Sequence, residues 1–324
     1  MTLLTVDRLS VNLQGESGPV ALVRDVSFTL DRRETLGIVG ESGCGKTMTA
    51  LALMGLLPEA ARAEGRILFD GEDLVTADEA RLCALRGDRI AMIFQEPMTS
   101  LNPVHTVGAQ VAEVLRLHRA MGEGEALAEA LRLLDLVGIP KARERLSAYP
   151  HQLSGGQRQR VMIAAALACR PDILLADEPT TALDVTVQAQ ILDLIGELVR
   201  EFGMALVLIT HDLGVVGQVT DRVIVMYAGN VVESGPTETI FAKRAHPYTQ
   251  GLFAARPRQA GRTSQRGRLD TIPGVVPDPS AVIAGCRFAD RCRHAVDICH
   301  RQPPPLVPIG ADHDALCHRV REWA

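Results

Sequence analysis

The stretch that most constrains the fold is GESGCGKT at positions 40–47, which directly follows the apolar run TLGIVG. It matches the pattern G-x-x-x-x-G-K-[ST], in which a buried strand enters a glycine-rich turn and then a helix. Glycines let backbone N–H groups turn inward around phosphate, and the start of the following helix adds a favourable dipole. The sequence therefore predicts a strand at 35–40, a phosphate-binding loop, and a helix over 47–57.

Two side chains of this loop have specific expected roles. Lys46 can reach the β- and γ-phosphates of a nucleotide, and the Thr47 hydroxyl can ligate Mg²⁺. Cys44 is interpreted as a spacer and not as a catalytic thiol. The loop residues predicted to bind nucleotide are Gly40, Glu41, Ser42, Gly43, Cys44, Gly45, Lys46 and Thr47.

A second motif, ILLADEP at 173–179, supplies adjacent carboxylates at the end of an apolar run. Such a run predicts a buried strand, so that Asp177 and Glu178 lie at its carboxyl end. Asp177 is expected to hold the magnesium shell, and Glu178 to polarise an attacking water. Acidic pairs at strand ends are often plain surface features, but a phosphate-binding loop upstream favours the functional interpretation.

Apolar runs typical of strands alternate with helical patterns along most of the chain. Strands are predicted at 66–70, 89–95, 172–177, 205–210 and 222–227, and helical patterns at 107–137, 158–168 and 186–202. This alternation predicts an α/β fold with a sheet that is at least partly parallel. The helical block at about 97–165 interrupts the alternation and is interpreted as an inserted subdomain.

Charge and hydropathy exclude some classes of protein. The net charge of −5, with 34 basic and 39 acidic residues, argues against nucleic acid as the main partner. The N-terminus MTLLTVDRLS lacks the apolar segment of a secretory signal. No apolar run approaches the ~20 residues that a membrane-spanning helix needs. We therefore expect a soluble or peripheral, cytoplasmic protein.

A third motif, LSGGQRQRV at 153–161, lies between the first two. The three together resemble the ATP-binding-cassette (ABC) ATPases, and their order fits that resemblance over about residues 3–253. A second glycine-rich helix start offers N–H donors for the face of the γ-phosphate that the first loop leaves open, so pairing in trans within a dimer is expected. Family members usually stack an aromatic residue on adenine, whereas this chain offers the aliphatic Leu13 at the corresponding strand end.

The resemblance also implies roles for residues outside the phosphate-binding loop. Gln95 would sense Mg²⁺ and water and face the membrane partner, and His211 would contact the γ-phosphate and position the water. Asp184 would lie in the loop that crosses the dimer interface. The residues implied to cap the γ-phosphate bound by the opposite subunit are Ser154, Gly155, Gly156 and Gln157.

Three further segments narrow the resemblance to the oligopeptide/dipeptide importers: EPMTSLNPVHTVGAQ (96–110), HPYTQGLFAARP (246–257) and TIPGVVPDP (271–279). This implies an ATPase domain over 1–253 and a C-terminal extension over 254–324. The implied partners are a second, different ATPase chain, two transmembrane permeases and an extracytoplasmic binding protein, with this chain peripheral at the cytoplasmic face of the inner membrane. Two alternatives stay open: import of another solute such as a nickel chelate or glutathione-like compound, and a soluble, non-transport ABC ATPase.

The extension carries a cluster of thiols. Cys286, Cys292, Cys299 and Cys317 are separated by five, six and seventeen residues, without the C-x₂₋₄-C pairs typical of structural zinc. The wide, irregular spacing favours a [4Fe–4S] cluster, and members of the resembled subgroup are thought to carry one. Zinc and a metal-free extension are the alternatives, with four histidines nearby as substitute ligands: His294, His300, His313 and His318. The expected role of the metal is structural.

Overall fold

The structure is a computed structural model that describes residues 1–323 except 16–17, 97–99, 182 and 256–270. Its centre is an eight-stranded sheet, and the five strands in the middle and at one end of this sheet run parallel. In spatial order the strands are β11 (Leu306–Gly310), β12 (His313–Leu316), β10 (Asn230–Pro236), β9 (Arg222–Tyr227), β3 (Thr35–Val39), β8 (Ala205–Thr210), β7 (Ile173–Asp177) and β6 (Ile90–Ile93). The partly parallel α/β sheet predicted from the sequence is confirmed.

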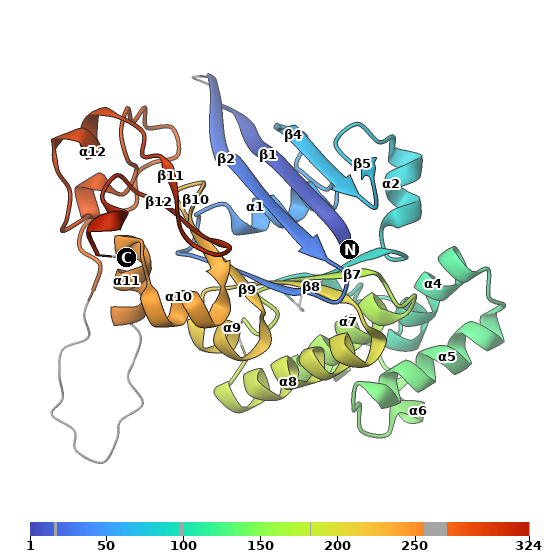
Figure 1. Ribbon diagram of the computed structural model, residues 1–324. Helices are drawn as coiled ribbons and strands as arrows, with labels where there is room; N and C mark the ends of the chain where they lie inside the picture. The colour runs from blue at the N-terminus through green and yellow to red at the C-terminus, as the bar shows by residue number, and fades with distance from the viewer. Residues whose placement is uncertain (16–17, 97–99, 182, 256–270, 324) are drawn as a thin grey trace, which may run out of the picture.

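A second, antiparallel sheet covers one side of the molecule (Figure 1). Its strands, in spatial order, are β2 (Gly18–Asp31), β1 (Thr2–Gly15), β4 (Ala61–Phe69) and β5 (Glu72–Asp73). Helix α1 (Lys46–Leu53) lies between the two sheets, and its apolar side chains join both in one core. The helix is shorter than the predicted 47–57 because Gly55, at φ 61°, turns the chain out of the helix.

The opposite face of the central sheet is covered by helices (Figure 1). Helices α7 (Gly155–Leu167) and α8 (Val185–Phe202) pack on β6–β8 in a second core, which also includes the apolar faces of α4 (Val107–Arg119) and α5 (Glu123–Leu136). The other α-helices in the described residues are α2 (Glu79–Leu85), α6 (Ala142–Arg145), α9 (Leu213–Val219), α10 (Thr237–Lys243), α11 (Pro247–Ala254) and α12 (Asp297–Arg301). Helix α7 begins three residues before the predicted Arg158 because Ser154 caps it.

The described part of the C-terminal extension is continuous with the central sheet. The hairpin of β11 and β12 pairs with β10, so the extension adds two strands to the edge of the sheet. Beneath it, the carboxylate of Glu233 is fully buried and accepts hydrogen bonds from the backbone N–H groups of Ala245 and His246 and from Nε2 of His313, at 2.8–2.9 Å. The sequence also predicts a solvated linker at 256–268, where RPRQAGRTSQRGR has five arginines and few apolar residues, and this segment lies outside the described residues.

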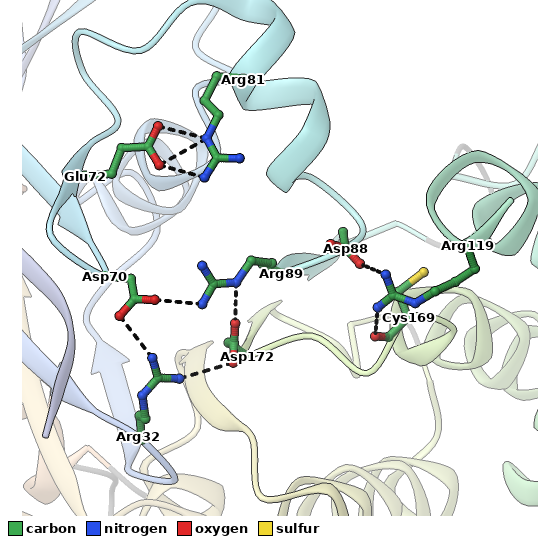
Figure 2. Close-up of polar contacts among 9 residues, drawn as sticks. All are labelled: Arg32, Asp70, Glu72, Arg81, Asp88, Arg89, Arg119, Cys169 and Asp172. Atoms are coloured by element: carbon green, nitrogen blue, oxygen red, sulfur yellow. Dashed lines mark hydrogen bonds and ion pairs between the residues drawn. The ribbon is translucent and has the colours of Figure 1, made fainter.

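A network of charges joins the two sheets at the end of the molecule that carries the amino ends of the parallel strands (Figure 2). Asp70, after β4, bonds to Arg32 and Arg89, each at 3.0 Å. Asp172, just before β7, bonds to the same two arginines at 3.2 and 2.7 Å. Two acids and two arginines thus form a closed ring that connects the antiparallel sheet to the central one.

Across the residues that the structure describes, no helix combines the length and apolar character needed to cross a membrane.

Candidate functional site

The phosphate-binding loop connects β3 to α1, as the sequence predicts. A Cβ added at Gly40 would lie 2.2 Å from the carbonyl oxygen of Met226 on β9. Gly45 adopts φ 106°, and a Cβ there would lie 2.8 Å from the carbonyl oxygen of Leu22 on β2. Both positions therefore require glycine, one for close approach and the other also for its backbone conformation.

The lysine of the loop is held over it by main-chain carbonyls. Nζ of Lys46 donates to the carbonyl oxygens of Gly40 at 2.9 Å and Glu41 at 3.1 Å. The Lys46 side chain is buried, whereas Ser42, Gly43 and Thr47 are exposed at the mouth of the loop. The ammonium group thus lies where a phosphate in the loop would need a positive charge.

Asp177 ends β7 beside this loop and is buried. Burial raises the pKa of its carboxyl group above the ordinary value, and the neighbouring Glu178 adds to the rise, while a hydrogen bond with Thr47 and the charge of Lys46 oppose it. Its Oδ1 has no hydrogen-bond partner among the described residues. A buried carboxylate with an uncommitted oxygen next to a threonine hydroxyl fits Mg²⁺, which takes hard oxygen ligands.

Glu178 stands next to Asp177 with φ 44°, a conformation uncommon for a residue with a side chain. Its Oε2 accepts from Nε2 of Gln95 at 3.1 Å and from the hydroxyl of Thr181 at 2.9 Å. Its Oε1 lies 3.3 Å from Nδ1 of His211. The three residues predicted to act in catalysis therefore meet at one carboxylate, although they follow three different strands: β6, β7 and β8.

The LSGGQ segment forms the start of α7. Ser154 and Gln157 make a reciprocal capping box, in which each side chain accepts from the other's backbone N–H. A Cβ added at Gly156 would lie 2.9 Å from Val187 of α8, whose N-terminus is capped by Asp184. Where the structure describes both segments, no hydrogen bond joins Ser154–Gln157 to the phosphate-binding loop. The starts of α7 and α8 lie next to each other, at Gly156 and Val187.

Leu13 is partly buried and packs against the first core.

The four C-terminal cysteines converge on one pocket, which His294 and His318 also line. Burial, with smaller contributions from the neighbouring thiols Cys292, Cys299 and Cys317, raises the pKa of Cys286 to about 11. Within the described ranges, however, no three His, Cys, Asp or Glu side chains are arranged closely enough to hold a single metal ion. The predicted metal-bound state of the extension is therefore not shown.

Three of the four histidines considered as ligands have other polar partners, and one of them is His318, whose Nε2 lies 3.0 Å from the carbonyl oxygen of Gln302. His313 is buried against Glu233, and Nδ1 of His300 lies 3.5 Å from a carboxylate oxygen of Asp290. Outside the C-terminal group of cysteines, Cys44 and Cys169 are buried.

Two residues that contact the phosphate-binding loop were not predicted from sequence motifs. Arg291 pairs with the carboxylate of Glu41 at 2.7 and 3.0 Å, and the hydroxyl of Tyr248 accepts from the Glu41 backbone N–H at 2.8 Å. Tyr248 lies in the HPYTQ segment, which the sequence analysis used only to identify a subgroup. No signal in the sequence associates Arg291 with the loop.

Comparison with known proteins agrees with this geometry. Residues 23–181 match the model of the ABC transporter family, and residues 232–299 match that of the oligopeptide/dipeptide transporter C-terminal region. The chain is 52% identical to the oligopeptide transport ATP-binding protein OppD of Salmonella typhimurium over 302 residues, 93% of this chain and 89% of OppD. It is 51% identical to OppD of Escherichia coli over 302 residues, which are again 93% of this chain and 89% of that protein.

A solved dimer of the ATP-binding cassette MJ0796, bound to ADP and phosphate, matches the fold with a TM-score of 0.65 and 30% identity. The match covers 72% of this chain and 98% of that one. The chain therefore belongs to the ATP-binding proteins of ABC transporters, with the C-terminal region of the oligopeptide/dipeptide group.

Proposed function

We propose that this chain binds and hydrolyses ATP to power the import of peptides through an ABC transporter. The observation that carries the proposal is the meeting of Gln95, Glu178 and His211 beside a phosphate-binding loop and a buried aspartate. Peptide as the transported solute is supported by the oligopeptide transport proteins that are about half identical to this chain over nearly its whole length.

In this proposal the residues of the loop bind the phosphates and the neighbouring acids prepare the reaction. Lys46 and the backbone N–H groups of 40–47 neutralise the β- and γ-phosphates. Thr47 and Asp177 would hold Mg²⁺, with Gln95 at its edge, and the ion would neutralise charge on the phosphate oxygens. Glu178 orients and polarises the attacking water, while His211 stabilises the γ-phosphate.

The other face of the γ-phosphate is left to a second ATPase subunit. The start of α7 offers backbone N–H groups and a helix dipole, and no hydrogen bond commits Ser154–Gln157 to the loop of its own chain within the described residues. We assign to Ser154, Gly155, Gly156 and Gln157 the capping of ATP bound by a partner ATPase. Asp184 caps α8, whose Val187 lies next to Gly156, and would lie at the same interface.

The remaining partners follow from peptide import. Two permease subunits and an extracytoplasmic binding protein would complete the transporter, with this chain peripheral at the cytoplasmic face of the inner membrane. The exposed Gln95 loop is the proposed docking segment for a permease, although residues 97–99 of that segment lie outside the described ranges.

For the cysteine pocket we propose a [4Fe–4S] cluster with a structural role. Four thiols without a carboxylate suit soft, thiolate-ligated iron. A zinc ion would need four ligand atoms within about 2.3 Å of one centre, and the thiols do not form so compact a group. A larger cluster tolerates the wider arrangement. Cys286, Cys292, Cys299 and Cys317 would hold it, and ligation would contribute folding energy to the extension.

The ATPase proposal is tested with Glu178→Gln in the assembled transporter. We expect hydrolysis to fall at least about 100-fold while MgATP binding is retained, because the amide keeps the shape but cannot accept a proton. The exposed Glu197→Gln on α8 is the matched control. Hydrolysis by the Glu178 variant at the wild-type rate would exclude this role. Stimulation of hydrolysis by peptide, and not by nickel chelates or glutathione, tests the substrate class.

The metal proposal is tested on the anaerobically purified full chain by its content of iron, acid-labile sulfide and zinc. We expect about four irons and four sulfides per chain. Cys292→Ser should lose them, while Cys83→Ser, at an exposed thiol away from the pocket, should not. One zinc without sulfide would replace the cluster with a structural zinc site.

A further inference from the structure

The C-terminal extension reaches the phosphate-binding loop through one arginine. Both terminal nitrogens of Arg291 bond to the carboxylate oxygens of Glu41, at 2.7 and 3.0 Å, across 250 residues of sequence. Only 6% of the Arg291 side chain is exposed, so this bidentate pair is shielded from solvent. Such charge-assisted, two-pronged contacts fix geometry more firmly than a single hydrogen bond.

The guanidinium is fully committed at this position. Nε donates to the carbonyl oxygen of Pro273 at 3.0 Å, and the remaining N–H groups have acceptors in the Tyr227 hydroxyl at 3.4 Å and the Ile272 carbonyl at 3.5 Å. Lysine, with a single ammonium group, could not reproduce this planar fork. Arg291 therefore links Glu41 both to residues of the extension and to Tyr227 on β9.

Glu41 in turn organises the start of the loop. Its backbone N–H is held by the Tyr248 hydroxyl at 2.8 Å. Its carbonyl oxygen accepts from Nζ of Lys46 at 3.1 Å and from the backbone N–H of Cys44 at 3.3 Å. A shift of Glu41 would therefore move the carbonyl that orients the phosphate-binding lysine.

We propose that Arg291 is a positioning residue for nucleotide binding, which fixes Glu41 and, through its carbonyl, Lys46. A loop that is already held in its binding conformation loses less freedom when phosphate enters it, and so binds more tightly. The inference rests on the proposed function, because it requires that nucleotide binds in this loop. It adds that the extension contributes to the affinity of the nucleotide site by fixing the conformation of the loop.

The position of Arg291 itself depends on the fold of the extension. It ends the short 3₁₀ helix Ala289–Arg291, which lies between Cys286 and Cys292. The Cys286 backbone N–H donates to the Cys299 carbonyl at 2.7 Å, which ties this turn to α12. The arginine is therefore presented to the loop only by a folded extension.

The test is the affinity of the full chain for MgADP, measured by calorimetry, in Arg291→Met. We expect affinity to fall on the order of tenfold, within the usual range of coupling between two sites. Arg293→Met makes the same change at an exposed position two residues away and should bind like the wild type. The double variant with Glu41→Gln should bind no more weakly than the weaker single variant, because both changes remove the same contact. Arg291→Lys should restore only part of the affinity.

The outcomes separate the two proposals. Failure of the wild-type chain to bind MgADP better than Lys46→Ala would overturn nucleotide binding at the loop itself. Wild-type affinity in folded Arg291→Met, or additive losses in the double variant, would overturn the positioning role alone. If Arg291→Met does not fold, Glu41→Gln breaks the same pair from the loop side, and wild-type affinity there would equally refute the inference. In the assembled transporter, KM for ATP should rise while kcat stays close to the wild-type value, since Glu178 is untouched.

Discussion

Glu233→Gln should separate the stability of the C-terminal extension from that of the ATPase core. The carboxylate is fully buried and accepts three hydrogen bonds, from the backbone N–H groups of Ala245 and His246 and from His313 on β12. The amide of glutamine can replace one oxygen only. Its NH₂ group would then face an N–H donor, and the charge that strengthens the other bonds would be lost.

The size of the effect follows from these contacts. Hydrogen bonds to a charged group contribute about 1.5–3 kcal/mol each, and a buried donor left without an acceptor costs about 1–3 kcal/mol. Because one oxygen keeps its partners in weakened form, we expect a net loss of about 3 kcal/mol. With a urea slope of about 3 kcal/mol/M, the unfolding midpoint of the affected region would fall by about 1 M.

The chain contains its own probe for this region. Trp323 is the only tryptophan, and its Nε1 donates to the Ala245 carbonyl at 2.8 Å, on the residue whose N–H is held by Glu233. In the variant, tryptophan fluorescence should change at lower urea than the far-ultraviolet circular dichroism of the core. Glu64→Gln, at an exposed position on β4, should shift neither signal. A change below about 1 kcal/mol in the Glu233 variant would refute the reasoning.

The effect should also depend on pH in a defined direction. Burial acts to raise the pKa of Glu233, but its hydrogen bonds, chiefly from His313, outweigh it and hold the pKa below the ordinary 4.5. The native state therefore favours the charged form, and the stabilisation is fully present above pH 4.5. It is lost as the pH falls through the lower pKa of the folded state. The stability difference between wild type and Glu233→Gln should be constant above that window and shrink within it.

Three further changes test other parts of the structure. Gly45→Ala should weaken MgADP binding, measured by calorimetry, by more than about tenfold, because φ is 106° and the new Cβ would clash with the Leu22 carbonyl oxygen. The control Gly122→Ala, which has open space around its Cβ position, should bind MgADP like the wild type. Asp177→Asn should raise the Mg²⁺ concentration for half-maximal hydrolysis at least about tenfold, in a metal titration, since a neutral amide is a poorer ligand. Asp172→Asn removes the charge from both arginine contacts drawn in Figure 2 and leaves an acceptor for only one of them. Because the groups are about one-third exposed, urea unfolding should show a loss of only about 1 kcal/mol that shrinks in high salt.

The parts of the fold that the sequence predicted are those encoded by neighbouring residues. The phosphate-binding loop occupies eight consecutive positions, so its pattern is visible in the sequence even though Gly40 and Gly45 are constrained by the distant carbonyl oxygens of Met226 and Leu22. The strands ending at Asp177 and Thr210 are uniformly buried and apolar, as central parallel strands are. Alternation alone did not predict strand β1, because bulges at Val6–Leu9 and Leu9–Val11, with Arg8 at φ 50°, break the pattern, and only the family resemblance placed a strand end at Leu13.

The site could be predicted only in part, for a related reason. The phosphate-binding residues and the Asp177–Glu178 pair follow from local motifs. Gln95 and His211 were expected near Glu178 only through the family resemblance, because nothing in their own neighbourhoods distinguishes them from ordinary surface residues. Their meeting depends on the order of strands in the sheet, which places β6, β7 and β8 side by side.

Arg291 shows where motif analysis stops. A motif identifies residues that touch the substrate, because their spacing is set by the shape of phosphate. The residues that hold such a motif in place are constrained by their contacts in the folded structure and not by their distance along the sequence. They can therefore come from any part of the chain. Here the anchor lies 250 residues from Glu41, in an extension that the sequence separated from the ATPase at 253/254. Strand β12 of the extension pairs with β10, and Arg291 forms an ion pair with Glu41 of the phosphate-binding loop. The extension and the nucleotide site are therefore joined by direct contacts. Mutations that unfold the extension should therefore weaken nucleotide binding even when every phosphate-binding residue is unchanged.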